Sequence, residues 1–118
     1  MTVSRRTLAG IVIGGAAALA GCSSSAGLAE GTVVLDVRTP AEYKAGHLQG
    51  AQNIDIEAAD FQNRISKLDK AATYFVYCHS GNRAGQAITI MKSMGFTKLT
   101  NGMGIDAASK TSGLPIVT

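Results

Sequence analysis

Residues 74–84 read Tyr-Phe-Val-Tyr-Cys-His-Ser-Gly-Asn-Arg-Ala. The apolar residues at the start of this stretch predict a buried strand over 73–77, which leads directly into Cys78 and a short polar loop. We expect a helix over residues 84–94, because apolar residues recur there at helical spacing. A strand, a tight loop and a helix in this order are typical of the repeating unit of a parallel α/β sheet.

The loop that follows the strand suggests a chemistry for Cys78. Five of the six residues from Cys78 to Arg83 can aim a backbone N–H inward if the loop is tight. Such a ring of amides, placed at a helix N-terminus, forms a concavity that binds anions. A cysteine sulfur at its centre would be favoured as the thiolate over the thiol. The stretch therefore indicates a site for sulfur chemistry.

The flanking sequence continues the alternation of strands and helices. Residues 32–37 are almost continuously apolar, as in a strand buried on both faces. Thr39 and Glu42 form a capping box around Pro40, and Gly46 suits the end of that short helix. Three further elements are expected: a strand over 52–56, a helix over 57–69 and a strand over 96–99. This order predicts an α/β fold with a central parallel β-sheet of four to five strands, flanked by helices on both faces, and a site at the carboxyl ends of the strands.

The first 21 residues have the pattern of an export signal. Arg5 and Arg6 precede a moderately apolar run of about 13 residues, which is too short to cross a bilayer. Leu19-Ala20-Gly21-Cys22 resembles the lipobox of bacterial lipoproteins, in which the signal is cut before a cysteine that carries a diacylglycerol. The pair of arginines also resembles a twin-arginine export motif. We expect lipidation of Cys22 and anchoring to the extracytoplasmic face of a bacterial membrane. The domain would then be located at the cell membrane or in the periplasm.

Removal of this signal would change the composition of the chain. Of 118 residues, 97 would remain: a Ser-, Ala- and Gly-rich tether over 22–31 and a single domain over 32–118. The net charge falls from +3 to +1 because two of the eleven basic residues leave with the signal, so no nucleic-acid partner is expected. Lipidation of Cys22 would leave Cys78 as the only free thiol, with no intrachain disulfide.

Two separated motifs resemble the rhodanese homology domain. Residues 34–54, from Val34-Leu-Asp to Gln-Asn-Ile54, are similar to the N-terminal signature of that family, and residues 78–84 are similar to its active-site loop. The likeness covers about residues 32–117. It implies a rhodanese-like fold and a cysteine persulfide at Cys78, which moves a sulfane sulfur from a donor such as thiosulfate or another persulfide to a thiol or cyanide acceptor. It implies no cofactor, and we expect a monomer.

The chain departs from this family in two ways. The extra strand and helix that usually precede the Asp-x-Arg strand are replaced by the short tether. Met103 interrupts the double glycine near the end of the domain, and the tryptophan that usually follows is missing, since the chain has none. We therefore expect residues 100–112 to pack loosely.

The length of the loop separates sulfur transfer from related chemistries. Four residues, His79 to Asn82, lie between Cys78 and Arg83. Phosphatases and arsenate reductases that resemble rhodaneses place five residues there, which makes a wider cradle for a tetrahedral oxyanion. The shorter loop favours a sulfur substrate. A non-catalytic binding or sensing module of the same fold is the other alternative, and the intact cysteine argues against it.

The expected roles of the candidate residues follow from these motifs. Cys78 is the nucleophile. The substrate-binding candidates are Arg83, His79, Ser80, Gly81 and Asn82, and Arg83 could equally be an anchor for the loop. Asp36 and Arg38 are expected to be mainly architectural and near the mouth of the pocket, with Glu42 in the same charge network. His47 is expected to cap the end of its helix. No spacing of histidines and cysteines indicates a metal site.

Overall fold

The computed structural model describes residues 27–118 of the chain. Four parallel strands form its main sheet in the order β3-β1-β4-β5. The strands are β1 (Val33–Asp36), β3 (Gln52–Asn53), β4 (Thr73–Cys78) and β5 (Lys98–Gly104). This parallel sheet confirms the α/β fold expected from the sequence. A small antiparallel pair, β2 (His47–Leu48) and β6 (Ile116–Val117), was not expected.

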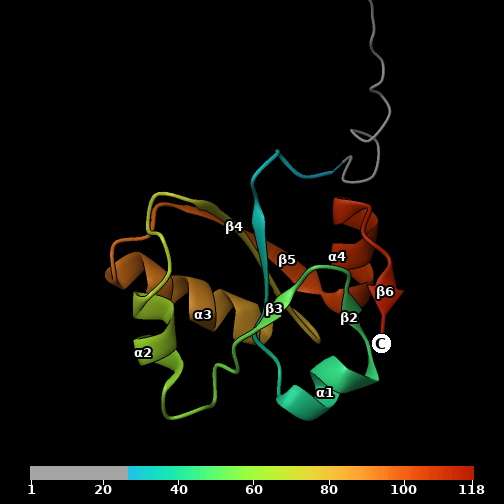
Figure 1. The fold of residues 1–118 in the computed structure, drawn as a ribbon, viewed down its shortest axis with the longest axis horizontal. Helices are drawn as coiled ribbons and strands as arrows, with labels where there is room; N and C mark the ends of the chain where they lie inside the picture. Colours follow the sequence, from blue (N-terminus) through green and yellow to red (C-terminus); the bar gives the residue numbers. More distant parts are fainter. Residues whose placement is uncertain (1–26) are drawn as a thin grey trace, which may run out of the picture.

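Helices cover both faces of the sheet. Figure 1 shows α2 (Phe61–Ser66) and α3 (Asn82–Ser93) on one side and α4 (Ile105–Ser112) on the other, with α1 (Pro40–Ala45) near the end of the sheet where β4 finishes. One apolar cluster joins α2 and α3 to the sheet, and a second joins α4 and β2 to its other face. Within residues 27–118, no helix has the length and apolar character needed to cross a membrane.

Several elements differ in length from their predicted ranges. The helix expected over 57–69 is the shorter α2, and only Gln52 and Asn53 of the strand expected over 52–56 lie in β3. The backbone beyond β3 still follows β1, since the N–H groups of Ile54 and Ile56 donate to the carbonyls of Asp36 and Val37. Helix α3 begins at Asn82, two residues before its predicted start, so Arg83 lies in its first turn.

The expectation that residues 100–112 pack loosely is wrong. Strand β5 continues to Gly104, and the side chains of Ala108 and Ser112 in α4 are fully buried. The fit depends on small residues rather than on a tryptophan. A Cβ atom at Gly102 would lie 2.7 Å from the ring of Phe75, so only glycine lets β5 pack this closely against the Phe75 side chain of β4.

The chain already contacts the domain before β1 begins. The N–H of Gly27 donates to the carbonyl of Ser112 at the end of α4, and Leu28 packs against the apolar cluster on that face. These residues belong to the second half of the predicted tether. The predicted signal, Cys22 and the first half of the tether lie outside the described residues.

Candidate active site

Cys78 is the last residue of β4 and lies at the carboxyl end of the parallel sheet. Its side chain is fully buried, and its thiol is free. The N–H of Gly81 donates a hydrogen bond to Cys78 Sγ at 2.8 Å. Of the inward amides expected from the sequence, this is the one for which the described residues show a hydrogen bond to the sulfur. The loop therefore places a buried sulfur against a backbone donor.

Gly81 holds the loop in a conformation that favours glycine. Its φ angle is 98°, in the left-handed region, and it is the N-cap residue of α3. Its carbonyl accepts hydrogen bonds from the N–H of Gly85 at 3.0 Å and from Asn101 Nδ2 at 3.3 Å. The left-handed turn and these two bonds fix the direction of the N–H that contacts Cys78.

Helix α3 adds a favourable field at the same place. It has twelve residues, and its N-terminus carries no side-chain cap. The partial positive charge of a helix N-terminus stabilises an anion placed there. A thiolate or a persulfide anion at Cys78 would therefore be stabilised by the helix as well as by Gly81.

Arg83 acts as an anchor in this structure. Its Nη1 and Nη2 donate to Oε1 and Oε2 of Glu42 at 2.9 and 3.0 Å, which joins the loop to α1. Glu42 is also the N3 residue of the predicted capping box, because its Oε1 accepts from the N–H of Thr39. The hydrogen bond from Arg83 lowers the pKa of Glu42 to about 2, against the effect of burial. The same bond raises the pKa of Arg83 against the effect of burial, and the negative charge of Glu42 adds to that shift.

The side chains of three further loop residues are exposed to solvent. His79, Ser80 and Asn82 are all exposed. The backbone beneath them is tightly packed, since a Cβ atom at Gly104 would lie 2.3 Å from the carbonyl oxygen of His79. The structure therefore leaves these three side chains exposed on a loop whose cysteine sulfur is buried.

Asp36 and Arg38 form a buried network next to the loop. Asp36 is fully buried, and its carboxylate accepts hydrogen bonds from Nε and Nη2 of Arg38. Arg38 Nη2 also donates to the carbonyl of Gly46 at 2.6 Å. Burial alone would lower the pKa of Arg38, but the hydrogen bond and charge of Asp36 outweigh it and raise that pKa. These contacts join the end of β1 to the end of α1.

Tyr77 connects this network to β4 and to the residue before the nucleophile. Its hydroxyl donates to Asp36 Oδ2 at 2.8 Å and accepts from the N–H of Leu48 at 2.9 Å. Burial raises the pKa of Tyr77, so the hydroxyl stays protonated. His47 has the predicted capping contact, because its Nδ1 lies 2.8 Å from the carbonyl oxygen of Tyr43 in α1.

Two residues of β5 complete the loop and were not singled out as site residues from the sequence. Asn101 bridges the two segments: its Nδ2 donates to Gly81, and its Oδ1 accepts from the N–H of Met103 at 2.8 Å. Met103 has a φ angle of 71°, the only positive value of a non-glycine residue between residues 27 and 118. Its Cε would lie 3.1 Å from a Cβ at Gly81, so its side chain borders the loop.

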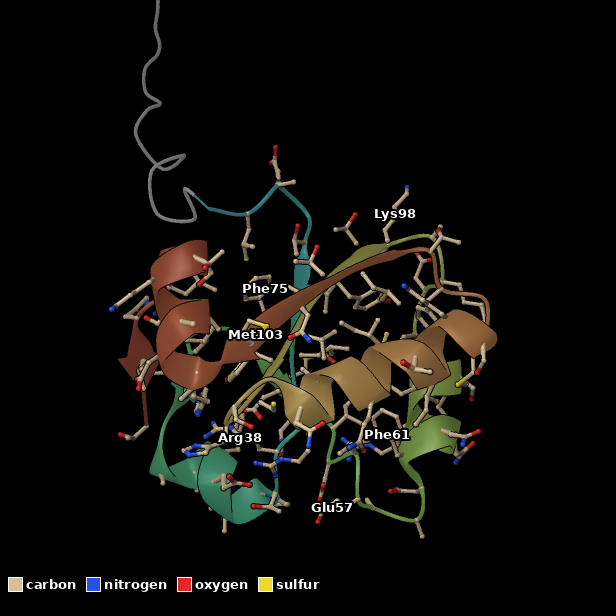
Figure 2. All side chains as sticks on the ribbon, turned by 180° about the vertical axis from the view of Figure 1, so that it is seen from behind. Arg38, Glu57, Phe61, Phe75, Lys98 and Met103 are labelled. Carbon is tan, nitrogen blue, oxygen red and sulfur yellow. The ribbon has the colours of Figure 1, made fainter. Side chains whose placement is uncertain are left out.

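Figure 2 shows the arrangement of the ends of the sheet. Met103 lies close to the first turn of α3, and Arg38 and Glu57 lie at the same end of the molecule, while Lys98 lies at the other end. In the part of the chain that the structure describes, no group of three or more His, Cys, Asp or Glu side chains could hold a metal ion.

Comparison with known proteins gives consistent matches. The family described as Rhodanese-like domain matches residues 24–104. The chain is 38% identical over 71 residues to the thiosulfate sulfurtransferase PspE of Escherichia coli K12, which covers 60% of this chain and 68% of PspE. It is 39% identical over 72 residues to the thiosulfate sulfurtransferase GlpE of Pseudomonas entomophila L48, covering 60% of this chain but only 63% of GlpE. A solved rhodanese with anions from E. coli has a TM-score of 0.61 and 34% identity, over 74% of this chain and 98% of the other.

Proposed function

The chain belongs to the family of rhodanese-like domains, and from this premise we propose that it is a sulfurtransferase that carries a sulfane sulfur on Cys78. The observation that carries the proposal is the hydrogen bond from the N–H of Gly81 to the buried Cys78 Sγ, at the N-terminus of α3. This hydrogen bond stabilises the Cys78 thiolate before it is loaded, and the N-terminus of α3 favours an anion there before and after loading.

The reaction needs two displacements at sulfur. The Cys78 thiolate attacks the outer sulfur of thiosulfate, a new S–S bond forms, and the S–S bond of the donor breaks to release sulfite. Cyanide or a thiolate then attacks the outer sulfur of the persulfide and leaves as thiocyanate or as a new persulfide, which restores the Cys78 thiolate. The thiolate carries its negative charge on Sγ, where the Gly81 N–H donates, and the persulfide carries it on the outer sulfur. The N-terminus of α3 favours a negative charge in both forms.

The burial of Cys78 affects which molecules can react. The sulfur is fully buried, so a small donor can reach it more readily than a large one. Once the persulfide has formed, the outer sulfur lies about 2 Å beyond Sγ, the length of an S–S bond. Loading would therefore favour small donors, while transfer would be open to larger acceptors.

The size of the loop supports sulfur over phosphate as substrate. Six residues from Cys78 to Arg83 form a tight ring, and both terminal nitrogens of Arg83 are occupied by Glu42. A tetrahedral phosphate would need more room and free donors. A non-catalytic module would not need a free cysteine held against an amide.

Mass spectrometry tests the proposal directly. A chain without residues 1–21, incubated with thiosulfate, should gain about 32 Da, the mass of one sulfur atom. The gain should be lost in Cys78→Ser and kept in Cys22→Ser. Sulfur found on the Cys78→Ser protein would refute the assignment. A wild-type protein that gains no sulfur, and whose Cys78 does not react with a thiol probe, would support a binding module.

The proposal also includes a location. The sequence Leu19-Ala20-Gly21-Cys22 supports cleavage before Cys22 and lipidation of its sulfur. Acyl chains at this position would give stable anchoring, since two chains hold a protein where one binds only marginally. The full-length protein should then be recovered with membranes, and Cys22→Ala should not be lipidated. A wild-type protein recovered as a soluble cytosolic chain that retains Met1 would refute this.

A further inference from the structure

Lysines are concentrated at the end of the sheet where its strands begin. In a parallel sheet all strands start at one edge, and each connecting helix returns to that edge at its C-terminus. Five exposed lysines lie there, which we call the lysine edge: Lys67 and Lys70 between α2 and β4, Lys92 and Lys110 in the last turns of α3 and α4, and Lys98 at the start of β5. Figure 2 shows Lys98 at the end opposite Arg38 and Glu57.

The charges of the described residues are divided between the two ends. Only two carboxylates, Glu30 and Asp69, accompany the five lysines, which leaves a net charge of +3 at the lysine edge. The opposite end, where the strands finish, has four basic and six acidic residues, a net charge of −2. The basic residues are Arg38, Lys44, Arg64 and Arg83, and the acidic residues are Asp36, Glu42, Asp55, Glu57, Asp60 and Asp106. Arg64 is in the last turn of α2, but its Nη2 donates to the carbonyl of Asn53 at the end of β3. The domain is therefore polarised along its strands although its total charge is only +1.

The chain enters the domain at the lysine edge. Gly27 precedes β1 and donates to the carbonyl of Ser112, at the end of α4. Five Cα-to-Cα steps separate Gly27 from Cys22, so these two residues can be at most about 18 Å apart. No residue from Cys22 to Gly27 is charged. An anchor at Cys22 would thus hold the positive end of the domain close to the surface that carries it.

We propose that the lysine edge lies on an anionic lipid surface and turns the Cys78 loop away from it. This inference rests on the lipid anchor proposed at Cys22. Lysines close to an anionic membrane are attracted to it, and the attraction acts over a Debye length of about 8–10 Å at moderate salt. The acidic end of the domain would be repelled by the same surface, so both ends favour one orientation.

This orientation serves the proposed chemistry. The six residues of β4 span about 17 Å from its start to Cys78, at about 3.3 Å for each residue. The loop would therefore lie beyond the reach of the negative surface potential, since that distance exceeds the Debye length. Anionic donors could then approach Cys78 from the aqueous side without repulsion from the lipid.

Lysine labelling on vesicles tests the orientation. The full-length chain is produced with its lipid and reconstituted in phosphatidylcholine vesicles with and without phosphatidylglycerol. It is labelled with an acetylating reagent and read by peptide mass spectrometry. We expect labelling of the lysine edge to fall several-fold on the anionic vesicles and to recover in high salt. Lys44, at the acidic end, is the internal control and should react equally on both.

Variants separate the possible outcomes. In Lys67→Gln/Lys70→Gln/Lys98→Gln, the protection of Lys92 and Lys110 should be lost, whereas Lys44→Gln should keep it. A chain that floats with both kinds of vesicle but shows equal labelling overturns the orientation and leaves the anchor standing. A chain that floats with neither overturns both. Thiocyanate formation from thiosulfate and cyanide, measured on the same samples, reports the sulfur chemistry separately.

Discussion

The guanidinium of Arg83 and the carboxylate of Glu42 form a bidentate ion pair between the first turn of α3 and the first turn of α1. Arg83 follows the nucleophile by five positions, so this pair fixes the far end of the Cys78 loop. Glu42 holds its own helix through Thr39 at the same time. The Glu42 carboxylate therefore links the start of α1 to the Cys78 loop at the start of α3.

The ion pair predicts how stability depends on pH. The hydrogen bond from Arg83 lowers the pKa of Glu42 from 4.5 to about 2, so the folded state holds this proton less tightly than the unfolded chain does. The stabilisation is complete above about pH 4.5 and is lost as the pH falls toward 2. Glu42→Gln keeps an acceptor for Thr39 but removes the charge. Because the pair is partly exposed, the variant should lose less than about 1 kcal/mol near neutral pH.

Urea unfolding followed by circular dichroism can measure this effect. The difference in the free energy of unfolding between wild type and Glu42→Gln should shrink between about pH 4.5 and pH 2. A difference that stays constant over that range would mean that the pair does not control the ionisation of Glu42.

Gly81→Ala should lower both stability and sulfur transfer. Gly81 has a φ of 98°, and an added Cβ would lie 3.1 Å from Met103 Cε and 3.2 Å from its Cα. The left-handed backbone costs a non-glycine residue about 1–2 kcal/mol. Any shift that relieves the contact also moves the N–H away from Cys78 Sγ. The rate of thiocyanate formation should therefore fall along with stability.

Gly50→Ala is the matched control for that change. Gly50 has a similar φ of 85°, but no atom lies within 4 Å of its Cβ position. It should lose a similar amount of stability and keep full activity at a temperature where both variants are folded. Equal losses of activity in the two variants would show that the position of the Gly81 N–H is not important.

Much of the fold could be predicted because its signals are local. The apolar stretch before Cys78, the Thr39–Glu42 capping box and the helix end at Gly46 each depend on neighbouring residues and an ordinary backbone rule. The pairing of Arg83 with Glu42 could not be predicted, because 41 positions separate the two residues and only the packing of α1 beside α3 brings them together. The sequence left the role of Arg83 open for this reason.

The missing tryptophan does not make residues 100–112 pack loosely. Small residues can fill the same space when the strand comes closer, as Gly102 does against Phe75. Asn101 was missed since its role depends on the register of β5, which has an irregularity opposite Val76 and Tyr77. A one-residue shift in register is not visible in the sequence.

Tyr77→Phe should be more destabilising than Tyr74→Phe. The hydroxyl of Tyr77 accepts from the N–H of Leu48 and donates to Asp36, so its removal leaves the buried N–H of Leu48 without a partner. It also takes one hydrogen bond from the buried Asp36 carboxylate, which keeps those from Arg38. We expect a loss of about 1–3 kcal/mol. The hydroxyl of Tyr74 donates only to the carbonyl of Asp69, and its loss should cost about 0.5–1.5 kcal/mol. Denaturant unfolding compares the two, and equal losses would argue against the buried network.

Met103→Gly should make Cys78 more reactive without weakening the fold. The φ of 71° strains a methionine but suits glycine, so relief of this strain offsets the greater entropy of glycine in the unfolded chain. Stability should stay within about 1 kcal/mol of the wild type, whereas Met103→Val should lose about 1–2 kcal/mol, because a β-branched residue is poorly accommodated in the left-handed region.

The side chain of Met103 borders Gly81, so its removal should widen the entrance to the loop. In a Cys22→Ser background, the rate of alkylation of Cys78 by a bulky maleimide should rise in Met103→Gly. Ile116→Ala, which shortens the other exposed large apolar side chain, should leave that rate unchanged. An alkylation rate that does not differ between Met103→Gly and the wild type would mean that the side chain of Met103 does not limit access to the sulfur.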